Sequence, residues 1–406
     1  MRNVAIMGIG ITQHVSKRRD VNIPELAYEA VILALNDACI GIKDVDALVS
    51  GNMHTFEGIN CPELWGGGYW GGYGKPVIRI TTGGSTGASV AQGAFYLVAS
   101  GLYDSVLCVA FEKQSDGIST VGLNAAAIAD MANWTAYGGG GAVVETSGAI
   151  GLFVYQATSY MEKSRCTIDH FDRAAAMLRN NAAKNPLAHL HQAGITAAEI
   201  AKSPMISYPL RFGHTCPTSD GACAMVIMSE DKAKRLSRKP VWVRGWASFS
   251  EDPAMTGLFG AGSLNIDPAE QRSCKFAAAR AYAMAGIKDP RKEIDLAEPY
   301  IAFAYMMFIF YERLLLCTEG DAPKLFDRGD MDLTGNLPVG PSGSVISSNA
   351  IGAAAMIRIA ECVLQIRGEA GQHQVTKKVH TAVAHGAGGQ ANFNGVTVLG
   401  DTPNRR

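Results

Sequence analysis

Residues 79–113 read RITTGGSTGASVAQGAFYLVASGLYDSVLCVAFEK, and this stretch decides the class of fold. Its pattern predicts a short strand, a glycine turn, a helix that begins on small residues, and then an apolar strand. A helix that begins directly after such a turn can offer backbone N–H groups to an oxyanion. The turn that contains Gly84 and Ser85 therefore has the form of an active-site elbow in an α/β protein.

The same order of elements recurs in the second half of the chain, which predicts a duplicated α/β unit. We expect an N-terminal half over residues 1–239 and a C-terminal half over residues 240–406. In the second half, the small-residue turn GPSGSVISSNAIG again precedes an alanine-rich helix, AAAMIRIAECVLQIRG. Within the first half, residues from about 133 to 220 form a partly helical insertion, which we expect to cover a pocket.

The composition excludes several classes of function. The chain has 406 residues, of which 48% are hydrophobic and 18% are charged, so a deep packed core is expected. The formal net charge of -1 shows no excess of basic residues, which binding to nucleic acid or to an anionic membrane would require. The longest apolar run, YIAFAYMMFIFY at residues 300–311, is about half of what a membrane-spanning helix needs. Small-molecule chemistry is the expected function.

The N-terminus and the cysteines indicate a cytoplasmic protein. The first residues, MRNVAIMGIGITQ, read as a strand rather than as an export signal, because Gly8 and Gly10 interrupt the short apolar run. The nine cysteines are odd in number, scattered, and never spaced as Cys-x-x-Cys. Neither a disulfide framework nor a zinc site is therefore expected in this chain, and no other metal site is predicted.

Seven segments, in their order along the chain, resemble the thiolase superfamily and, within it, the sterol-carrier-protein-type and lipid-transfer branch. They are VAIMGIGIT, ASGLYDSVLCVAFEK, NNAAKNPLAH, CPTSDGACAMVIMSE, IDLAEPYIAF, LPVGPSGSVISSNAIGAAA and VAHGAGGQANFNGVTVL. The resemblance implies a five-layered α-β-α-β-α fold, a homodimer and coenzyme A (CoA) thioester substrates, with no covalently bound cofactor. None of these properties follows from composition or periodicity.

The elbow departs from this family at the position of the nucleophile. Family members carry their acylated cysteine in a Cys-Ser-Thr-Gly or Cys-Ala-Ser-Gly turn, and here the turn reads Gly84-Ser85-Thr86-Gly87. Because Gly84 has no side chain, the route through an acyl-cysteine is closed at this position. A serine nucleophile needs an adjacent general base, and the resemblance implies that the Ser85 side chain turns away from the substrate. We therefore predict that Ser85 and Thr86 cap the helix.

The other family positions have changed as well. Tyr300 stands where the family motif places Asn or His, and it can donate a proton to the substrate. Asn349 replaces the histidine of a Gly-His-Pro turn, and an amide cannot act as a base near neutral pH. Gly386 replaces the second cysteine, and we expect it to form part of the reactive turn with Gly84 and Ser85. The adjacent His385 is then the nearest candidate base, with a structural hydrogen-bonding role as the alternative.

A pocket around these residues is expected to include His214, Ser347, Trp65 and Trp70. The two tryptophans lie in the glycine-rich and aromatic segment 58–76, which either closes over a bulky or aryl acyl group, packs against another chain, or forms a buried edge. Cys61, in the same segment, is the thiol that the sequence places nearest to the pocket, because the others fall in strands, helices or the insertion.

Three functions remain open at this point. The first is CoA-dependent cleavage of a bulky or aryl β-oxoacyl-CoA, and it ranks first because most members of the superfamily transfer acyl groups. The second is retro-aldol cleavage of a β-hydroxyacyl-CoA, which needs no acyl-enzyme and which Gly84 favours. The third is a non-catalytic subunit that binds acyl-CoA. The resemblance also implies a small separate partner with a zinc ribbon and an oligonucleotide-binding-type (OB) barrel, which would hold the only zinc and extend the homodimer to a heterotetramer.

Overall fold

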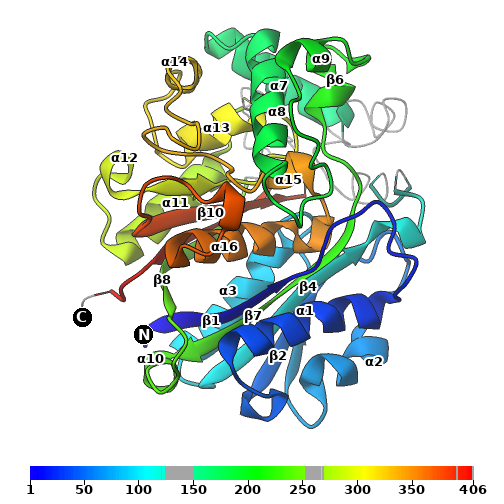
Figure 1. Cartoon of the computed structure of the whole chain (residues 1–406), viewed down its shortest axis with the longest axis vertical. Helices are drawn as coiled ribbons and strands as arrows, with labels where there is room; N and C mark the ends of the chain where they lie inside the picture. The colour runs from blue at the N-terminus through cyan, green and yellow to red at the C-terminus, as the bar shows by residue number, and fades with distance from the viewer. Residues whose placement is uncertain (120, 124–149, 252–266, 268, 390–391, 405–406) are drawn as a thin grey trace, which may run out of the picture.

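The computed structural model describes residues 1–119, 121–123, 150–251, 267, 269–389 and 392–404. The strands are β1 (Val4–Ile11), β2 (Ala47–Gly51), β3 (Val77–Arg79), β4 (Ser105–Lys113), β5 (Met205–Ser207), β6 (Leu210–Arg211), β7 (Asp220–Ser229), β8 (Val241–Ser250), β9 (Leu296–Glu298), β10 (Thr381–Gly388) and β11 (Phe393–Gly400). One mixed sheet has the order β3-β2-β4-β7-β1-β8-β11-β10-β9, and β5 pairs with β6 as a separate hairpin (Figure 1).

The described residues form thirteen α-helices. They are α1 (Ile23–Ala38), α2 (Glu63–Gly66), α3 (Thr86–Ala99), α7 (Ile150–Lys163), α8 (Ile168–Ala182), α9 (Ala197–Ala201), α10 (Glu230–Ala233), α11 (Arg272–Ala285), α12 (Pro290–Glu293), α13 (Met306–Arg313), α14 (Ala322–Asp327), α15 (Ser344–Ser347) and α16 (Ile351–Arg367). α1 covers β1, β4 and β7, and α11 covers β8 and β11. α3 and α16 pack together and contact strands of both halves, so they form the central layer (Figure 1). The predicted α-β-α-β-α fold is confirmed.

Two glycines in β1 let α1 approach the sheet closely. A Cβ added at Gly8 would lie 2.1 Å from the Ala34 carbonyl oxygen, and one at Gly10 would lie 2.1 Å from the Ala30 carbonyl oxygen. Both distances are well inside van der Waals contact, so any side chain there would push the helix away. The Gly-x-Gly pattern at the start of the chain therefore serves helix–strand packing.

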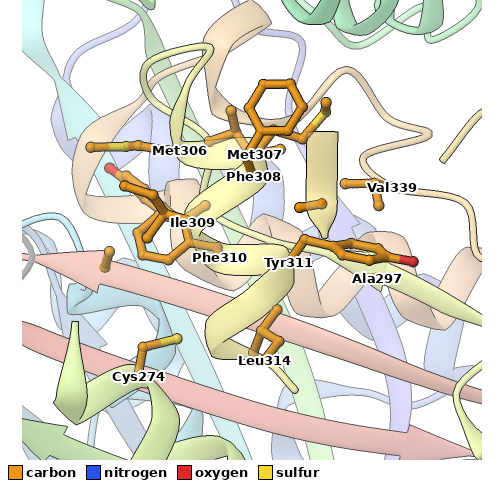
Figure 2. Close-up of a cluster of buried hydrophobic side chains, with 14 of the residues drawn as sticks. Cys274, Ala297, Met306, Met307, Phe308, Ile309, Phe310, Tyr311, Leu314 and Val339 are labelled. Atoms are coloured by element: carbon orange, nitrogen blue, oxygen red, sulfur yellow. The ribbon is translucent and has the colours of Figure 1, made fainter. Parts of the chain in front are cut away.

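The apolar run at residues 300–311 becomes a buried turn followed by α13. Phe308 and Phe310 of this helix are fully buried. Figure 2 shows them in a hydrophobic cluster that also includes Cys274 of α11. The length of the run thus reflects burial of the helix on all sides. Among the described residues, no helix is long and apolar enough to cross a membrane.

The predicted insertion lies partly outside the described residues, which omit 133–149. Its remainder contains α7, α8, α9 and the β5–β6 hairpin. The ring of Phe171 in α8 lies 6.5 Å from that of Phe308 in α13, and both belong to one hydrophobic cluster. The insertion therefore packs on the second half. The predicted boundary between residues 239 and 240 falls between α10 and β8 and stays a prediction.

Candidate active site

A cavity of about 420 Å³ lies between the elbow and the segment that follows β9. Gly84, Tyr300 and Asn349, three of the residues predicted from the sequence, all line it. Most of the other lining side chains are apolar, and they include Phe153, Phe212, Phe303, Met53 and Met306. An apolar lining of this kind suits the apolar part of a small-molecule ligand.

Tyr300 occupies the space that a side chain at position 84 would need. A Cβ added at Gly84 would lie 2.8 Å from the Tyr300 hydroxyl oxygen and 2.7 Å from the Ala387 carbonyl oxygen. Tyr300 is only 5% exposed, and burial raises the pKa of its phenol far above the ordinary value. The phenol is therefore a neutral hydrogen-bond donor at the cavity wall, and the missing side chain at Gly84 gives it room.

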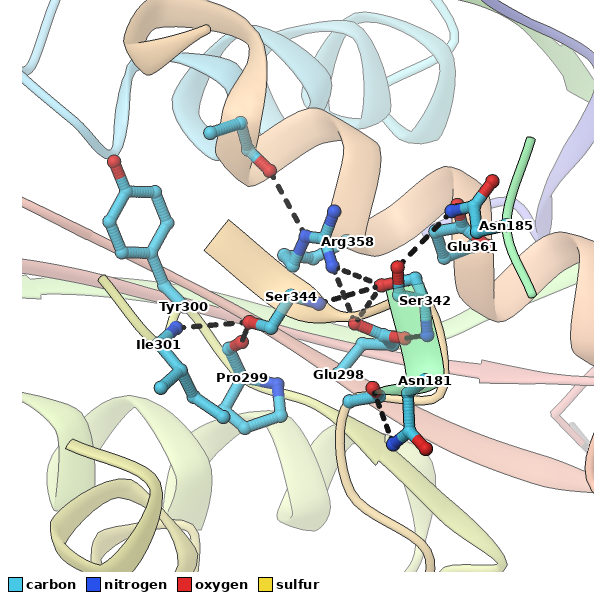
Figure 3. A network of polar contacts seen from close by, with 12 residues as sticks. Asn181, Asn185, Glu298, Pro299, Tyr300, Ile301, Ser342, Ser344, Arg358 and Glu361 are labelled. Carbon is cyan, nitrogen blue, oxygen red and sulfur yellow. Dashed lines mark hydrogen bonds and ion pairs between the residues drawn. The ribbon is translucent and has the colours of Figure 1, made fainter. Parts of the chain in front are cut away.

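A buried ion pair holds the strand end that carries Tyr300. Glu298, the last residue of β9, lies 2.7 Å from Arg358 of α16, and both side chains are almost completely buried. Ser342 donates to Glu298 through both its backbone N–H and its hydroxyl. Figure 3 shows the ring of Tyr300 projecting away from this network. The network thus fixes the backbone while leaving the phenol free to face the cavity.

Asn349 connects Tyr300 with a thiol. Its Oδ1 lies 3.5 Å from the Tyr300 hydroxyl, which can donate to it, and its Nδ2 donates to Cys216 Sγ at 3.2 Å. Two backbone contacts fix the residue: its N–H donates to Ser219 Oγ, and its carbonyl oxygen accepts from Gln114 Nε2. These two contacts hold the Asn349 backbone in place beside the cavity.

Ser85 is neither a nucleophile with a base nor a helix cap. Its hydroxyl donates to the Thr82 carbonyl oxygen at 2.7 Å and lies 2.9 Å from Thr82 Oγ1. The residue occupies the N-cap position of α3, but its side chain makes no capping hydrogen bond. The capping prediction is therefore wrong, because the tight glycine turn brings Thr82 within reach of the hydroxyl first.

His385 holds the backbone of Tyr300 and does not line the cavity. Its Nδ1 accepts from the Tyr300 N–H at 3.4 Å, and its Nε2 donates to Asn394 Oδ1 at 2.8 Å. Burial lowers the pKa of the imidazole to about 4, so the ring is neutral. The prediction of His385 as the base is wrong, because the residue lies deeper along β10, with the Phe310 ring 4.3 Å away.

Gly386 also faces away from the cavity. A Cβ added there would lie 2.7 Å from Ala355 Cβ and 2.9 Å from Ala88 Cβ, which belong to the central helices. The lining residues of β10 are instead Ala387 and Gly388. The prediction that Gly386 forms part of the reactive turn is therefore wrong.

The histidine and serine predicted for the pocket are buried elsewhere. His214 is completely buried, with Nε2 2.8 Å from Asp172 Oδ1 and Nδ1 accepting from the Arg211 N–H. Ser347 is completely buried in α15 and is not among the lining residues. Both predictions are wrong, because nearby side chains and backbone enclose these residues behind the cavity wall.

The aromatic segment does not reach the cavity either. Trp70 is completely buried, donates its indole N–H to the Pro24 carbonyl oxygen at 3.0 Å, and packs against Phe111. Trp65 is 47% exposed, and the thiol of Cys61 also lies at the surface. None of the three lines the cavity. The buried-edge alternative therefore describes Trp70, and the prediction that Trp65 and Trp70 cover the substrate is wrong.

Cys216 is an ionisable pocket residue that the sequence analysis did not predict. It lies half-buried in the loop before β7 and lines the cavity beside Asn349. A β-bridge between Thr215 and Phe303 brings this loop to the segment that carries Tyr300. The sequence held one signal for it, since CPTSDG is part of a segment that resembles the family.

The described lining residues contain only two ionisable side chains, Tyr300 and Cys216. No Asp, Glu, His, Lys or Arg is among them. Nor do the described parts of the chain contain a group of three or more His, Cys, Asp and Glu side chains placed to bind a metal ion. Acid–base chemistry carried by these lining residues would therefore have to use a phenol or a thiol.

Comparisons with known proteins agree with the fold. Residues 263–401 match the family model described as thiolase C-terminal domain-like. Sterol carrier protein 2 of Bos taurus is 30% identical over 386 residues, which cover 92% of this chain and 68% of that protein. A steroid side-chain-cleaving aldolase of Thermomonospora curvata is 29% identical over 372 residues, 90% of each chain.

Two solved structures also share the fold of this chain. The Ltp2-ChsH2(DUF35) aldolase superposes with a TM-score of 0.81 at 26% identity, over 98% of this chain and 97% of that one. Human mitochondrial 3-ketoacyl-CoA thiolase shares the fold, with a TM-score of 0.71 at 15% identity over 99% of both chains.

The duplicated five-layer fold, with its cavity at the elbow, defines a thiolase-like enzyme that acts on carbon–carbon bonds, as an acyltransferase or as a lyase. More narrowly, the chain belongs to the sterol-carrier-protein-2-type branch of the thiolase superfamily. The hypothesis of a non-catalytic scaffold is not retained.

Proposed function

We propose that this enzyme cleaves a β-hydroxyacyl-CoA by a retro-aldol reaction. The observation that carries the proposal is the pairing of Gly84 with Tyr300, because a phenol fills the place where an acylated side chain would begin. A retro-aldol cleavage needs no acyl-enzyme, whereas the ordinary thiolase route does. The similarity to two aldolases supports the same reaction class.

In this proposal, Tyr300 donates its hydroxyl proton in a hydrogen bond to the thioester oxygen. When the bond between the α- and β-carbons breaks, negative charge develops on that oxygen, and a donor in a dry pocket stabilises it. Phe153, Phe212 and Phe303 provide an apolar surface for the part of the substrate that leaves as a ketone or aldehyde. We therefore propose a bulky apolar or aryl acyl group.

A second candidate is CoA-dependent cleavage of a β-oxoacyl-CoA. One observation favours it: Cys216 places a thiol in the cavity, where a thiolase would need one. Against it, the thiol does not lie on the elbow, where the resemblance places the acylated cysteine, but in the loop before β7. We therefore rank this candidate second.

Free CoA distinguishes the two reactions. With a panel of aryl and steroid-derived acyl-CoA substrates, we expect cleavage of β-hydroxy compounds at the same rate with and without free CoA. Chromatography should detect a ketone or aldehyde and one shorter acyl-CoA. Cleavage of β-oxo compounds that consumes CoA and yields two acyl-CoA products would contradict the retro-aldol assignment and favour the second candidate.

We also propose that the chain forms a homodimer through β3. This strand lies at the edge of the main sheet, so one side of its backbone has no strand partner among the described residues. Its apolar residues Val77 and Ile78 are 40% and 39% exposed. Exposed apolar edge strands are sites where two copies of a chain pair.

Light scattering on the purified chain is expected to give about twice the monomer mass of 43.0 kDa. Val77→Lys should shift the protein towards the monomer, because a lysine at the paired edge would lose its hydration. Phe276→Lys is a matched control, since Phe276 is 54% exposed but belongs to α11 in the outer layer of the other half. A monomeric wild type, or equal loss of dimer in both variants, would contradict the proposal.

The proposed assembly includes a small zinc-ribbon and OB-barrel subunit, with low activity of this chain alone. The name of the similar Ltp2-ChsH2(DUF35) structure, which pairs two components, supports a partner. CoA enters as part of the substrate, and the zinc belongs to the partner. We further propose a cytoplasmic location, because all nine cysteines are free thiols.

A further inference from the structure

The proposed reaction requires a group that moves a proton, and Tyr300 is not that group, because it remains a neutral donor to the thioester oxygen. We infer that Cys216 carries the proton from the β-hydroxyl to the α-carbon, and that Arg179 and Asn349 stabilise its thiolate. The inference rests on the proposed retro-aldol function.

The contact with Asn349 orients Cys216 for this role. Asn349 Nδ2 donates to Cys216 Sγ at 3.2 Å, so the sulfur is the acceptor and its own proton remains available to a molecule in the cavity. An amide N–H that already points at the sulfur also stabilises the thiolate once that proton leaves. The same amide faces the Tyr300 hydroxyl through Oδ1, which brings both ionisable lining groups to one amide.

Arg179 supplies a buried positive charge behind the thiol. It lies on α8, is 9% exposed, and donates from one nitrogen to the carbonyl oxygens of Gly213 and Thr215, both at 3.2 Å. Within the described part of the chain, no carboxylate lies within salt-bridge distance of this guanidinium, and its Nε has no hydrogen-bond partner. A buried cation without a counter-charge is unfavourable, and a thiolate at Cys216 would provide one.

The surrounding charges act on the thiol in opposite directions. Burial raises the pKa of Cys216 to about 11, while the Asn349 amide and the Arg179 charge lower it. Tyr300 lines the same cavity, and burial raises the pKa of its phenol, so it stays neutral. On the segment that precedes Cys216 and on α8, Asp172 contacts His214 and Arg211. Since the thiolate is the form that accepts the proton, activity should rise with pH above neutrality.

The proton balance of the step closes without another reactant. The Cys216 thiolate takes the proton of the β-hydroxyl, the alkoxide electrons form the new carbonyl, and the bond between the α- and β-carbons breaks. Its electron pair becomes the enolate of the shorter acyl-CoA, with the enolate oxygen at Tyr300. The thiol then gives its proton to the α-carbon and returns to the thiolate. The hydroxyl proton has moved to carbon, and nothing is oxidised or reduced.

Exchange of α-protons tests this step without the unidentified substrate. In D₂O, the proposed enzyme complex should exchange the α-protons of acetyl-CoA or propionyl-CoA for deuterium, measured by NMR. Cys216→Ser and Cys216→Ala should each lower the exchange rate by about a hundredfold, the usual contribution of a positioned acid–base group. Cys61→Ala, which removes a surface thiol outside the cavity, should exchange at the wild-type rate. Unchanged melting temperatures would exclude misfolding as the cause.

The outcomes separate this inference from the proposed function. Wild-type exchange rates in Cys216→Ala, or no exchange in the wild type, would overturn the role of Cys216. If exchange depends on Cys216 but carbon–carbon cleavage consumes free CoA, the retro-aldol function fails while the proton-transfer role of the thiol stands.

Alkylation tests the role of Arg179 with a readout that does not depend on activity. The rate at which iodoacetamide modifies Cys216, followed by peptide mass spectrometry between neutral pH and about pH 11, reports the pKa of the thiol. Arg179→Met should shift this profile to higher pH, and Arg179→Lys should restore most of it. The same profile in the wild type and Arg179→Met would show that the guanidinium does not stabilise the thiolate.

Discussion

Tyr300→Phe is expected to lower kcat about a hundredfold while leaving CoA binding and folding nearly unchanged. The substitution keeps the ring, which is buried, and removes only the hydroxyl that faces the cavity. Loss of one donor to a developing oxyanion commonly costs about 3 kcal/mol of barrier. Because the hydrogen bond strengthens as charge develops, kcat should fall much more than KM changes. Steady-state kinetics on the complex with its substrate measures both parameters.

Tyr282→Phe is the matched control for this prediction. Tyr282 is also buried, but its hydroxyl donates to the Leu314 carbonyl oxygen at 2.8 Å, away from the cavity. Its loss should cost about 1 kcal/mol of stability and leave kcat alone. Gly84→Ala tests the same geometry from the other side, since the new methyl would lie 2.8 Å from the Tyr300 hydroxyl oxygen and displace it. Wild-type kcat in Tyr300→Phe would remove the phenol from the mechanism.

The sequence predicted the fold well because the fold depends on local patterns. Local sequence patterns predict the alternation of strands with alanine-rich helices, and also the glycine turn at the start of each helix. Gly84, Tyr300 and Asn349 were placed by the same segments, and all three line the cavity. These residues stand at the ends of elements, where the order of the elements along the chain already fixes their neighbourhood.

The wrong site predictions concern residues whose direction depends on tertiary packing. Gly386 is adjacent to a lining residue, Ala387, yet faces the central helices. His385 lies on the same strand as Ala387, but its ring packs against the Phe310 ring and does not reach the cavity. Trp70 is buried by α1, which the local sequence does not reveal. Cys216 joins the site through a bridge between segments almost ninety residues apart, Thr215 to Phe303.

The largest expected loss of stability comes from separating Glu298 and Arg358. Glu298→Gln keeps the shape of the side chain but leaves the Arg358 guanidinium buried without its closest carboxylate. Removing one partner of a buried ion pair typically costs about 3 to 5 kcal/mol. Because Glu298 ends the strand that presents Tyr300, kcat should fall as well, even though the pair does not touch the substrate. Chemical denaturation at neutral pH measures the free energy of unfolding.

Arg358→Met should be less damaging, and its cost should depend on pH. The carboxyl left behind can take up a proton and become neutral, whereas an arginine cannot lose one. Burial already raises the pKa of Glu298, and Arg358 opposes that shift, so removing the arginine raises the pKa further. A carboxyl with a raised folded-state pKa stabilises the protein most below its unfolded-state pKa and loses that contribution as pH rises through the folded-state pKa. Arg358→Met should therefore approach the wild type in acid and fall behind it at neutral pH. A pH-independent difference between the two proteins would mean that Glu298 does not carry the charge that Arg358 balances.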